Sequence, residues 1–132
     1  MKKSLSFVPA GLLLLALLAP LSASSQAPNP FLGDWKGKIS IPDAGVELGI
    51  AVHFSMNDKK ELTGTLDSLD QGAMGLPLGS IKTEGRNIEF KIEGVPGDPL
   101  FKGALDETGK IFSGTFSQNN YEGTFKTEKA AK

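Results

Sequence analysis

The sequence predicts an all-β protein, a small antiparallel up-and-down barrel of about eight strands. Two observations support this fold class. After residue 30, apolar and polar residues alternate with a period of two, and turn residues interrupt the alternation at short intervals, which is typical of half-buried strands. No stretch of this region shows apolar residues spaced three and four apart over ten residues, so we expect no long helix.

The first 26 residues have the three parts of a secretory signal peptide. Lys2 and Lys3 supply positive charge, an apolar run (LLLLALL) covers residues 12–18, and small residues follow Pro20. The run is shorter than the about 20 apolar residues that a membrane span needs. We therefore expect cleavage near residue 26, a secreted or periplasmic location, and no membrane span after cleavage.

Composition narrows the classes of function. The chain has no Cys, which excludes disulfides, a thiolate nucleophile and a Cys-based zinc site. Without Lys2 and Lys3, 12 basic residues face 15 acidic ones, and the net charge is −3. Basic and acidic residues are interspersed along the chain, whereas nucleic-acid binding requires a clustered basic surface. Nucleic acid is therefore not expected as a partner.

The predicted elements form one domain. A polar, proline-containing linker (27–32) leads into the barrel domain (33–127), and a disordered tail is expected over 128–132. The predicted strands are, in chain order, Trp35 to Ile41, Val46 to Met56, Leu62 to Asp67, Leu76 to Thr83, Asn87 to Ile92, Leu100 to Leu105, Ile111 to Ser117 and Tyr121 to Thr127.

Each strand is justified by its alternation and by the turn residues at its ends. The segment 46–56 is the clearest, because Val, Leu, Ile, Val, Phe and Met occupy one of its faces in succession. The turn sequences between the strands are PDAG, NDKK, DQG, EGRN, PGDP, DETG and QNN, all rich in residues that favour turns. Most gaps are so short that they connect only antiparallel neighbours. The stretch 68–75 (SLDQGAMG) is irregular and long enough for a helical turn or a flap.

Five strands carry a glycine midway along their apolar face. These glycines are Gly37, Gly64, Gly103, Gly114 and Gly123. Glycine inside a strand costs about 0.5–1 kcal/mol relative to alanine, so its repeated use indicates strong strand curvature or a need for interior room. A small closed barrel meets both conditions, and the short gaps also favour a barrel over a β-sandwich.

Three segments resemble a known domain. FLGDWKG (31–37), VHF (52–54) and LTGTLDS followed by DQG (62–68 and 70–72) are similar to the small β-barrel accessory domain that precedes the catalytic domain in many secreted bacterial α/β-hydrolases. That family usually has Pro where Leu69 stands here, and the hydrolase domain itself does not follow in this chain. The resemblance implies a calycin-like or lipocalin-like barrel with an accessory role and no esterase activity.

The residues themselves give little sign of catalysis. His53 is the only histidine, and because Val52 and Phe54 take the inward face, we expect it to point outward as an ordinary surface residue. No Gly-x-Ser-x-Gly elbow precedes a helix. We therefore expect a protein that is not an enzyme and that uses no cofactor.

The loop after residue 66 is the best candidate for a specific contact. Asp67 and Asp70 are ordinary turn formers that accept hydrogen bonds from local backbone amides. A weak metal site or a contact with a partner through Asp67, Asp70 and Gln71 is the alternative interpretation.

The expected function is a secreted, non-enzymatic module that binds a small apolar ligand in or at the mouth of the barrel, between the loops 68–75 and 94–99. The alternative is a protein-interaction or dimerisation module. If Phe101, Phe112, Phe116 and Phe125 interlock across the interior, the barrel is solid and the outer surface has to carry the function. The candidate ligand-binding residues are Trp35, Phe54, Leu66, Met74, Phe90, Phe101, Phe112 and Tyr121.

Overall fold

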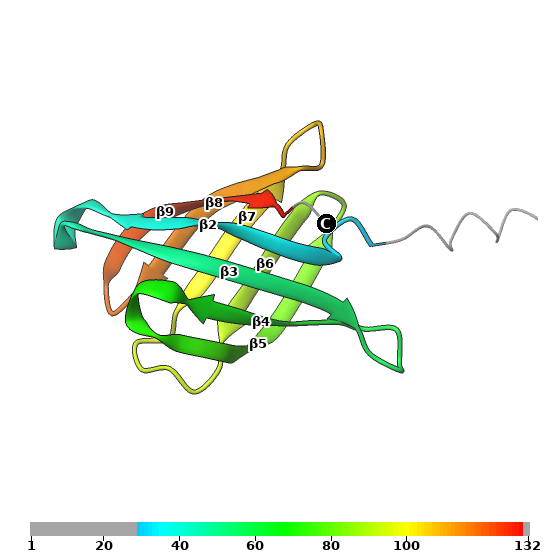
Figure 1. Ribbon diagram of the computed structural model, residues 1–132, viewed down its shortest axis with the longest axis horizontal. Coiled ribbons are helices and arrows are strands. Elements are labelled where there is room, and N and C mark those ends of the chain that lie inside the picture. The colour runs from blue at the N-terminus through cyan, green and yellow to red at the C-terminus, as the bar shows by residue number, and fades with distance from the viewer. Residues whose placement is uncertain (1–28, 131–132) are drawn as a thin grey trace, which may run out of the picture.

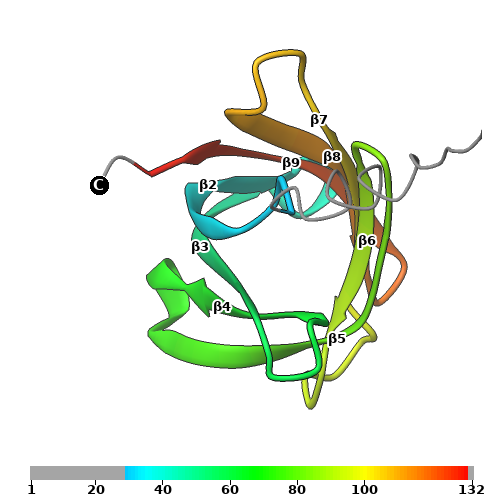
Figure 2. The ribbon, with the colours of Figure 1, turned by 90° about the vertical axis from the view of Figure 1, so that its right-hand side faces the viewer.

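The computed structural model describes residues 29–130 as a closed barrel of eight antiparallel strands (Figures 1 and 2). The strands are β2 (Gly33–Ile41), β3 (Val46–Met56), β4 (Leu62–Ser68), β5 (Ala73–Glu84), β6 (Asn87–Ile92), β7 (Leu100–Leu105), β8 (Ile111–Gln118) and β9 (Tyr121–Lys129). Two 3-10 turns, η2 (Pro42–Ala44) and η3 (Leu69–Gln71), complete the elements. The predicted fold class is confirmed, and η3 is the helical turn expected in the stretch 68–75. The predicted signal peptide lies outside the described residues.

Each strand pairs with the next one in sequence, and β2 pairs with β9 to close the barrel. Turns therefore alternate between two ends. We call the end where β2 begins the proximal end; it carries the turns 57–61, 85–86 and 106–110. The opposite, distal end carries the turns 42–45, 69–72, 93–99 and 119–120 (left in Figure 1). Neither 3-10 turn within residues 29–130 is long and apolar enough to cross a membrane.

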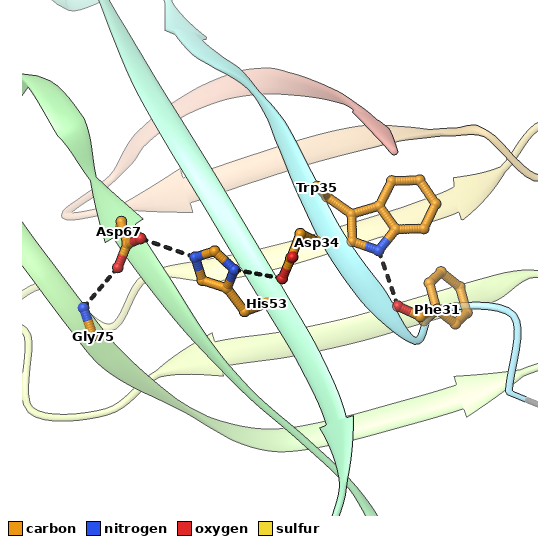
Figure 3. A network of polar contacts seen from close by, with 6 residues as sticks. All are labelled: Phe31, Asp34, Trp35, His53, Asp67 and Gly75. Carbon is orange, nitrogen blue, oxygen red and sulfur yellow. Dashed lines mark hydrogen bonds and ion pairs between the residues drawn. The ribbon is translucent and has the colours of Figure 1, made fainter. Parts of the chain in front are cut away.

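The edges of the domain differ from those expected. Strand β9 continues to Lys129, two residues past the predicted limit of the barrel. Phe31, which was assigned to the linker, is fully buried and packs against the rings of Phe54 and Phe112 at centroid distances of 6.1 and 5.9 Å. Its carbonyl oxygen accepts a 2.9 Å hydrogen bond from Trp35 Nε1 (Figure 3). The folded domain thus begins before its first strand.

Aromatic rings fill the interior. The ring centroid of Phe101 lies 4.8 Å from that of Phe90, 4.9 Å from that of Phe116 and 5.1 Å from that of Phe125. The ring centroids of Phe112 and Phe125 are 5.5 Å apart. Most of these pairs are tilted or edge-to-face, which is a favourable arrangement for aromatic side chains. The rings of Phe101, Phe112, Phe116 and Phe125 therefore interlock across the interior, as expected for a solid barrel.

The strand glycines allow neighbouring backbones to approach closely. A Cβ on Gly37 would collide with the carbonyl oxygen of Lys126 in β9, and a Cβ on Gly114 with that of Lys102 in β7. Strands in a tightly coiled barrel come this close only where a side chain is missing. The sequence suggested either strand curvature or a need for interior room as the reason for these glycines. The contacts support curvature, because aromatic rings occupy the interior.

Candidate functional site

His53 joins two carboxylates on the outer wall of the barrel. Its Nδ1 lies 2.8 Å from Asp34 Oδ1, and its Nε2 lies 2.9 Å from Asp67 Oδ2 (Figure 3). The second oxygen of Asp67 accepts a 2.7 Å hydrogen bond from the backbone N–H of Gly75. A continuous polar network therefore runs from β2 across β3 and β4 to the beginning of β5.

Strand register brings these residues together. His53 is the direct partner of Asp34 in the β2–β3 pair and of Thr65 in the β3–β4 pair. Asp67 lies two residues beyond Thr65, on the same outward face of β4, and is a diagonal neighbour of His53. The outward orientation predicted for His53 is confirmed, whereas its two carboxylate partners were not predicted.

The network shifts two pKa values in opposite directions. Hydrogen bonds to Asp34 and, second, to Asp67 raise the pKa of His53 above its ordinary value of 6.5, because a protonated imidazole donates to both carboxylates. The Gly75 amide and, second, His53 lower the pKa of Asp67 below its ordinary value of 3.8. A positively charged ring between two negative groups is the protonation state that this geometry favours.

The same geometry limits the chemistry available to His53. Both ring nitrogens already have carboxylate partners, and within residues 29–130 no hydroxyl group is hydrogen-bonded to the ring. A nucleophile activated by histidine requires such a contact. Among these residues, no group of three or more His, Asp or Glu side chains is arranged to hold a metal ion. The network is better suited to holding strands and a loop together than to moving protons.

The loop between β4 and β5 is shaped by its own polar side chains. Asp70 Oδ2 accepts a 2.6 Å hydrogen bond from the backbone N–H of Gly49 in β3, which ties η3 to the barrel wall. The hydroxyl of Ser68 donates to Gln71 Oε1 over 2.7 Å. Asp67 and Asp70 therefore accept hydrogen bonds from backbone amides, as expected, but the amides are not local: Gly75 is eight residues from Asp67 and Gly49 is 21 residues from Asp70.

The eight candidate ligand-binding residues fall into two groups. Six of them are buried and belong to one hydrophobic core: Trp35, Phe54, Leu66, Phe90, Phe101 and Phe112. Met74 and Tyr121 are 64% and 48% exposed and lie apart from that core, at the distal end. Hollows of about 560 and 480 Å³ on the surface of the described residues are lined by other side chains, over β5 to β7 and beside the 57–61 turn.

Apolar side chains are exposed at the distal end. Met74 and Tyr121 are joined there by Val46, at the start of β3, and by Leu69 in η3. Leu48, Leu76 and Val95 are half-buried and pack against the core. We call Val46, Leu69, Met74 and Tyr121 the distal apolar group.

Comparisons with known proteins give no relative. No protein-family model, curated protein or solved structure matches the chain. The packing, the loop contacts and the exposed side chains of residues 29–130 are therefore the basis for assigning a function.

Proposed function

We propose that the protein is an exported, non-catalytic module that binds a protein partner through its distal end. The observation that carries this proposal is the exposure of the distal apolar group beside a loop held in shape by its own side chains. The aromatic rings that fill the interior add support, because a ligand inside the barrel would have to displace rings that contact one another at 4.8 to 5.5 Å.

Exposed apolar side chains that gather at one end favour an interface. Single exposed apolar residues are common on monomeric proteins, but several together often mark a contact surface. Met and Tyr are enriched at such surfaces, and the flexible Met side chain adapts to the shape of a partner. Met74 and Tyr121 fit this description.

A loop that is already ordered improves binding. Ordering a flexible side chain or loop costs free energy on association, so a preformed loop binds more tightly than a mobile one with the same contacts. Asp67, Asp70 and Ser68 hold the 68–75 loop through three short hydrogen bonds. Leu69 and Met74 are then presented in a fixed arrangement.

The first partner class to test follows from the resemblance in the sequence. The segments around Trp35 and the TGTLDS-x-DQG run are similar to a barrel that accompanies secreted α/β-hydrolases, which implies an accessory role beside such an enzyme. The 68–75 loop, which contains the most specific part of that resemblance, is also the loop that presents Leu69 and Met74. We therefore expect the partner to be a secreted protein, with hydrolases as the leading candidates.

Two methionines at opposite ends provide a matched test. Met74 is 64% exposed at the distal end and Met56 is 42% exposed beside the 57–61 turn at the proximal end. Wild type, Met74→Glu and Met56→Glu are each immobilised and used to capture proteins from the secreted fraction of the source cells. Binding constants are then measured for the captured partner, and sedimentation tests whether the protein binds a second copy of itself.

The proposal expects Met74→Glu to weaken binding about tenfold or more, because a charge in an apolar contact loses its hydration. Met56→Glu is expected to bind as wild type does. Equal binding by the two variants would contradict the proposal, and so would a wild-type protein that captures nothing and stays monomeric at all concentrations tested.

A small apolar ligand at the distal mouth is the second candidate. Val46, Met74 and Tyr121 each lie near the distal end of a strand, on the face that points into the core further along that strand. They therefore form the outermost part of the barrel lining. This function predicts a bound small molecule in native mass spectrometry of gently purified protein, or saturable binding of an apolar dye that Met74→Glu abolishes. A protein that is empty and has no saturable dye site contradicts it.

A further inference from the structure

We infer that the partner's docking segment is cationic, with Lys or Arg side chains around an apolar centre. This inference rests on the proposed function, since it describes the partner of the same distal end. It comes from the distribution of charge between the two ends of the barrel, which the apolar side chains alone do not explain.

The turns of the two ends have different charges. The distal turns contain four carboxylates and no Lys or Arg: Asp43, Asp70, Glu93 and Asp98. The proximal turns contain four carboxylates and four basic residues: Asp58, Lys59, Lys60, Glu61, Arg86, Asp106, Glu107 and Lys110. The turns therefore carry a net charge of −4 at the distal end and of zero at the proximal end, so the unbalanced negative charge lies where the apolar side chains are exposed.

Lysines on the strands compensate little of this charge. Lys91 lies 3.4 Å from Asp98, and Lys38 lies 3.8 Å from Glu47 at the distal part of β3. Both ion pairs are exposed, with 77% of the Asp98 side chain and 64% of the Glu47 side chain open to solvent. Exposed pairs of this kind are weak and leave the carboxylates able to exchange partners.

Exposed apolar side chains and unbalanced carboxylates at the same end select a particular partner surface. Opposite charges across an interface speed association and suppress unsuitable partners. Lys and Arg suit this end especially well because their methylene stems pack on apolar surface while their charged heads reach the rim. An apolar segment flanked by these residues complements both the distal apolar group and the carboxylates of the same end.

The same charges disfavour a second copy of this chain as the occupant. Two distal ends that met face to face would bring the four turn carboxylates of each copy together. Like charges brought to an interface repel one another and are costly to desolvate. The structure therefore favours a different, positively charged partner over self-association through this end.

Two model peptides and two matched triple variants test the inference. The peptides are amphipathic and of equal length, with Leu at the same positions. One peptide carries Lys at alternate polar positions, and the other carries Glu at those positions. The distal variant combines Asp43→Asn, Glu93→Gln and Asp98→Asn. The proximal control combines Asp58→Asn, Glu84→Gln and Glu107→Gln, which removes the same charge from the opposite end. Binding is measured by titration, and the peptide is located on the protein through changes in backbone amide chemical shifts.

We expect the Lys peptide to bind at the distal end and the Glu peptide not to bind. The distal variant weakens binding of the Lys peptide about eightfold, because each exposed charge contributes about a factor of two. A higher salt concentration also weakens binding of the Lys peptide to wild type. The proximal variant binds as wild type does. Equal binding of both peptides, or equal losses in the two variants, overturns the inference.

The captured partner separates this inference from the proposed function. If Met74→Glu releases that partner while the distal carboxylate variant holds it as tightly as wild type, the distal end is the docking site and the cationic partner is refuted. If Met74→Glu also holds the partner, the docking site itself is refuted.

Discussion

Replacement of Phe31 by Ala tests whether the folded domain begins before its first strand. Phe31 is fully buried, and its ring packs edge-on against Phe54 and Phe112. Its backbone carbonyl oxygen, which accepts the hydrogen bond from Trp35, is kept in the variant. The substitution therefore removes the ring and leaves the polar anchor.

The expected cost follows from the buried ring. Loss of a fully buried Phe side chain removes about 2–3 kcal/mol of hydrophobic transfer free energy, and the cavity that remains raises the usual total to about 3–5 kcal/mol. Phe31 belongs to a segment that precedes the sheet and can partly collapse, so we expect the lower part of this range, about 3 kcal/mol. This is a large share of the about 5–15 kcal/mol that stabilises most domains.

The single tryptophan provides the assay. Trp35 is fully buried, so its fluorescence reports unfolding in guanidinium chloride, and far-ultraviolet circular dichroism checks that both probes follow one transition. Phe31→Leu is expected to cost less than about 1.5 kcal/mol because it keeps most of the apolar volume. Met56→Ala, at an exposed position of the same end, is expected to change stability by less than about 0.5 kcal/mol. If Phe31→Ala costs no more than Met56→Ala, the ring does not belong to the core.

Three further perturbations probe the barrel wall and the loop. Gly114→Ala is expected to cost about 2 kcal/mol or more in the unfolding free energy, because the added Cβ collides with a backbone carbonyl of β7. The raised pKa of His53 adds stability that is fully present below pH 6.5 and is lost as the pH rises through the raised pKa. The lowered pKa of Asp67 adds stability that is present above pH 3.8 and is lost as the pH falls through the lowered pKa. Between pH 3.8 and pH 6.5 both contributions are present. In this range the unfolding free energy of wild type should exceed that of His53→Gln by about 1 kcal/mol, because the network is partly exposed. Asp70→Ala removes the acceptor of the Gly49 amide, and we expect about 1 kcal/mol of destabilisation with faster hydrogen exchange at that amide.

Controls separate these effects from general damage. Gly49→Ala makes the same change inside a strand, outside the left-handed region of φ, and its Cβ meets the nearest atom, Asp70 Oδ2, at 3.4 Å, an ordinary van der Waals distance. A loss as large as that of Gly114→Ala would therefore refute the collision. Asp34→Asn should remove only part of the pH dependence, since Asp67 still holds His53. A wild-type stability that does not change between pH 5 and pH 9 would contradict the coupling within the network. For Asp70→Ala, unchanged exchange of the Gly49 amide would show that this bond does not hold the loop.

The strands were predictable because alternation and turn residues are local signals. The predicted and observed bounds of β3 and β6 agree at both ends, and the outward face of His53 follows from its neighbours Val52 and Phe54. Both observations depend only on the period of two in an extended chain. The fold class therefore required no knowledge of distant contacts.

The features that escaped prediction depend on distant residues. The contact of His53 with Asp34 and Asp67 requires the register of three strands, which alternation leaves undetermined. Phe31 lies between Pro30 and the first strand and has no alternation of its own, so its burial depends on the rings that meet it across the barrel. Whether the interior is hollow or filled depends on how closely the strands coil, and the sequence indicates the presence of strand glycines but not the distances between strands.

The closure of the barrel by its first and last strands has a consequence for how this module is attached to other chains. The amide of Ala130 donates a 2.8 Å hydrogen bond to the carbonyl of Asp34. The first strand therefore begins beside the place where the last strand ends. A tether or a fused domain at either terminus would leave from that side and point away from Met74 and Tyr121. Circular permutation through a short linker between these neighbouring termini should consequently preserve the barrel, and an anchored copy would hold its opposite face toward the surroundings.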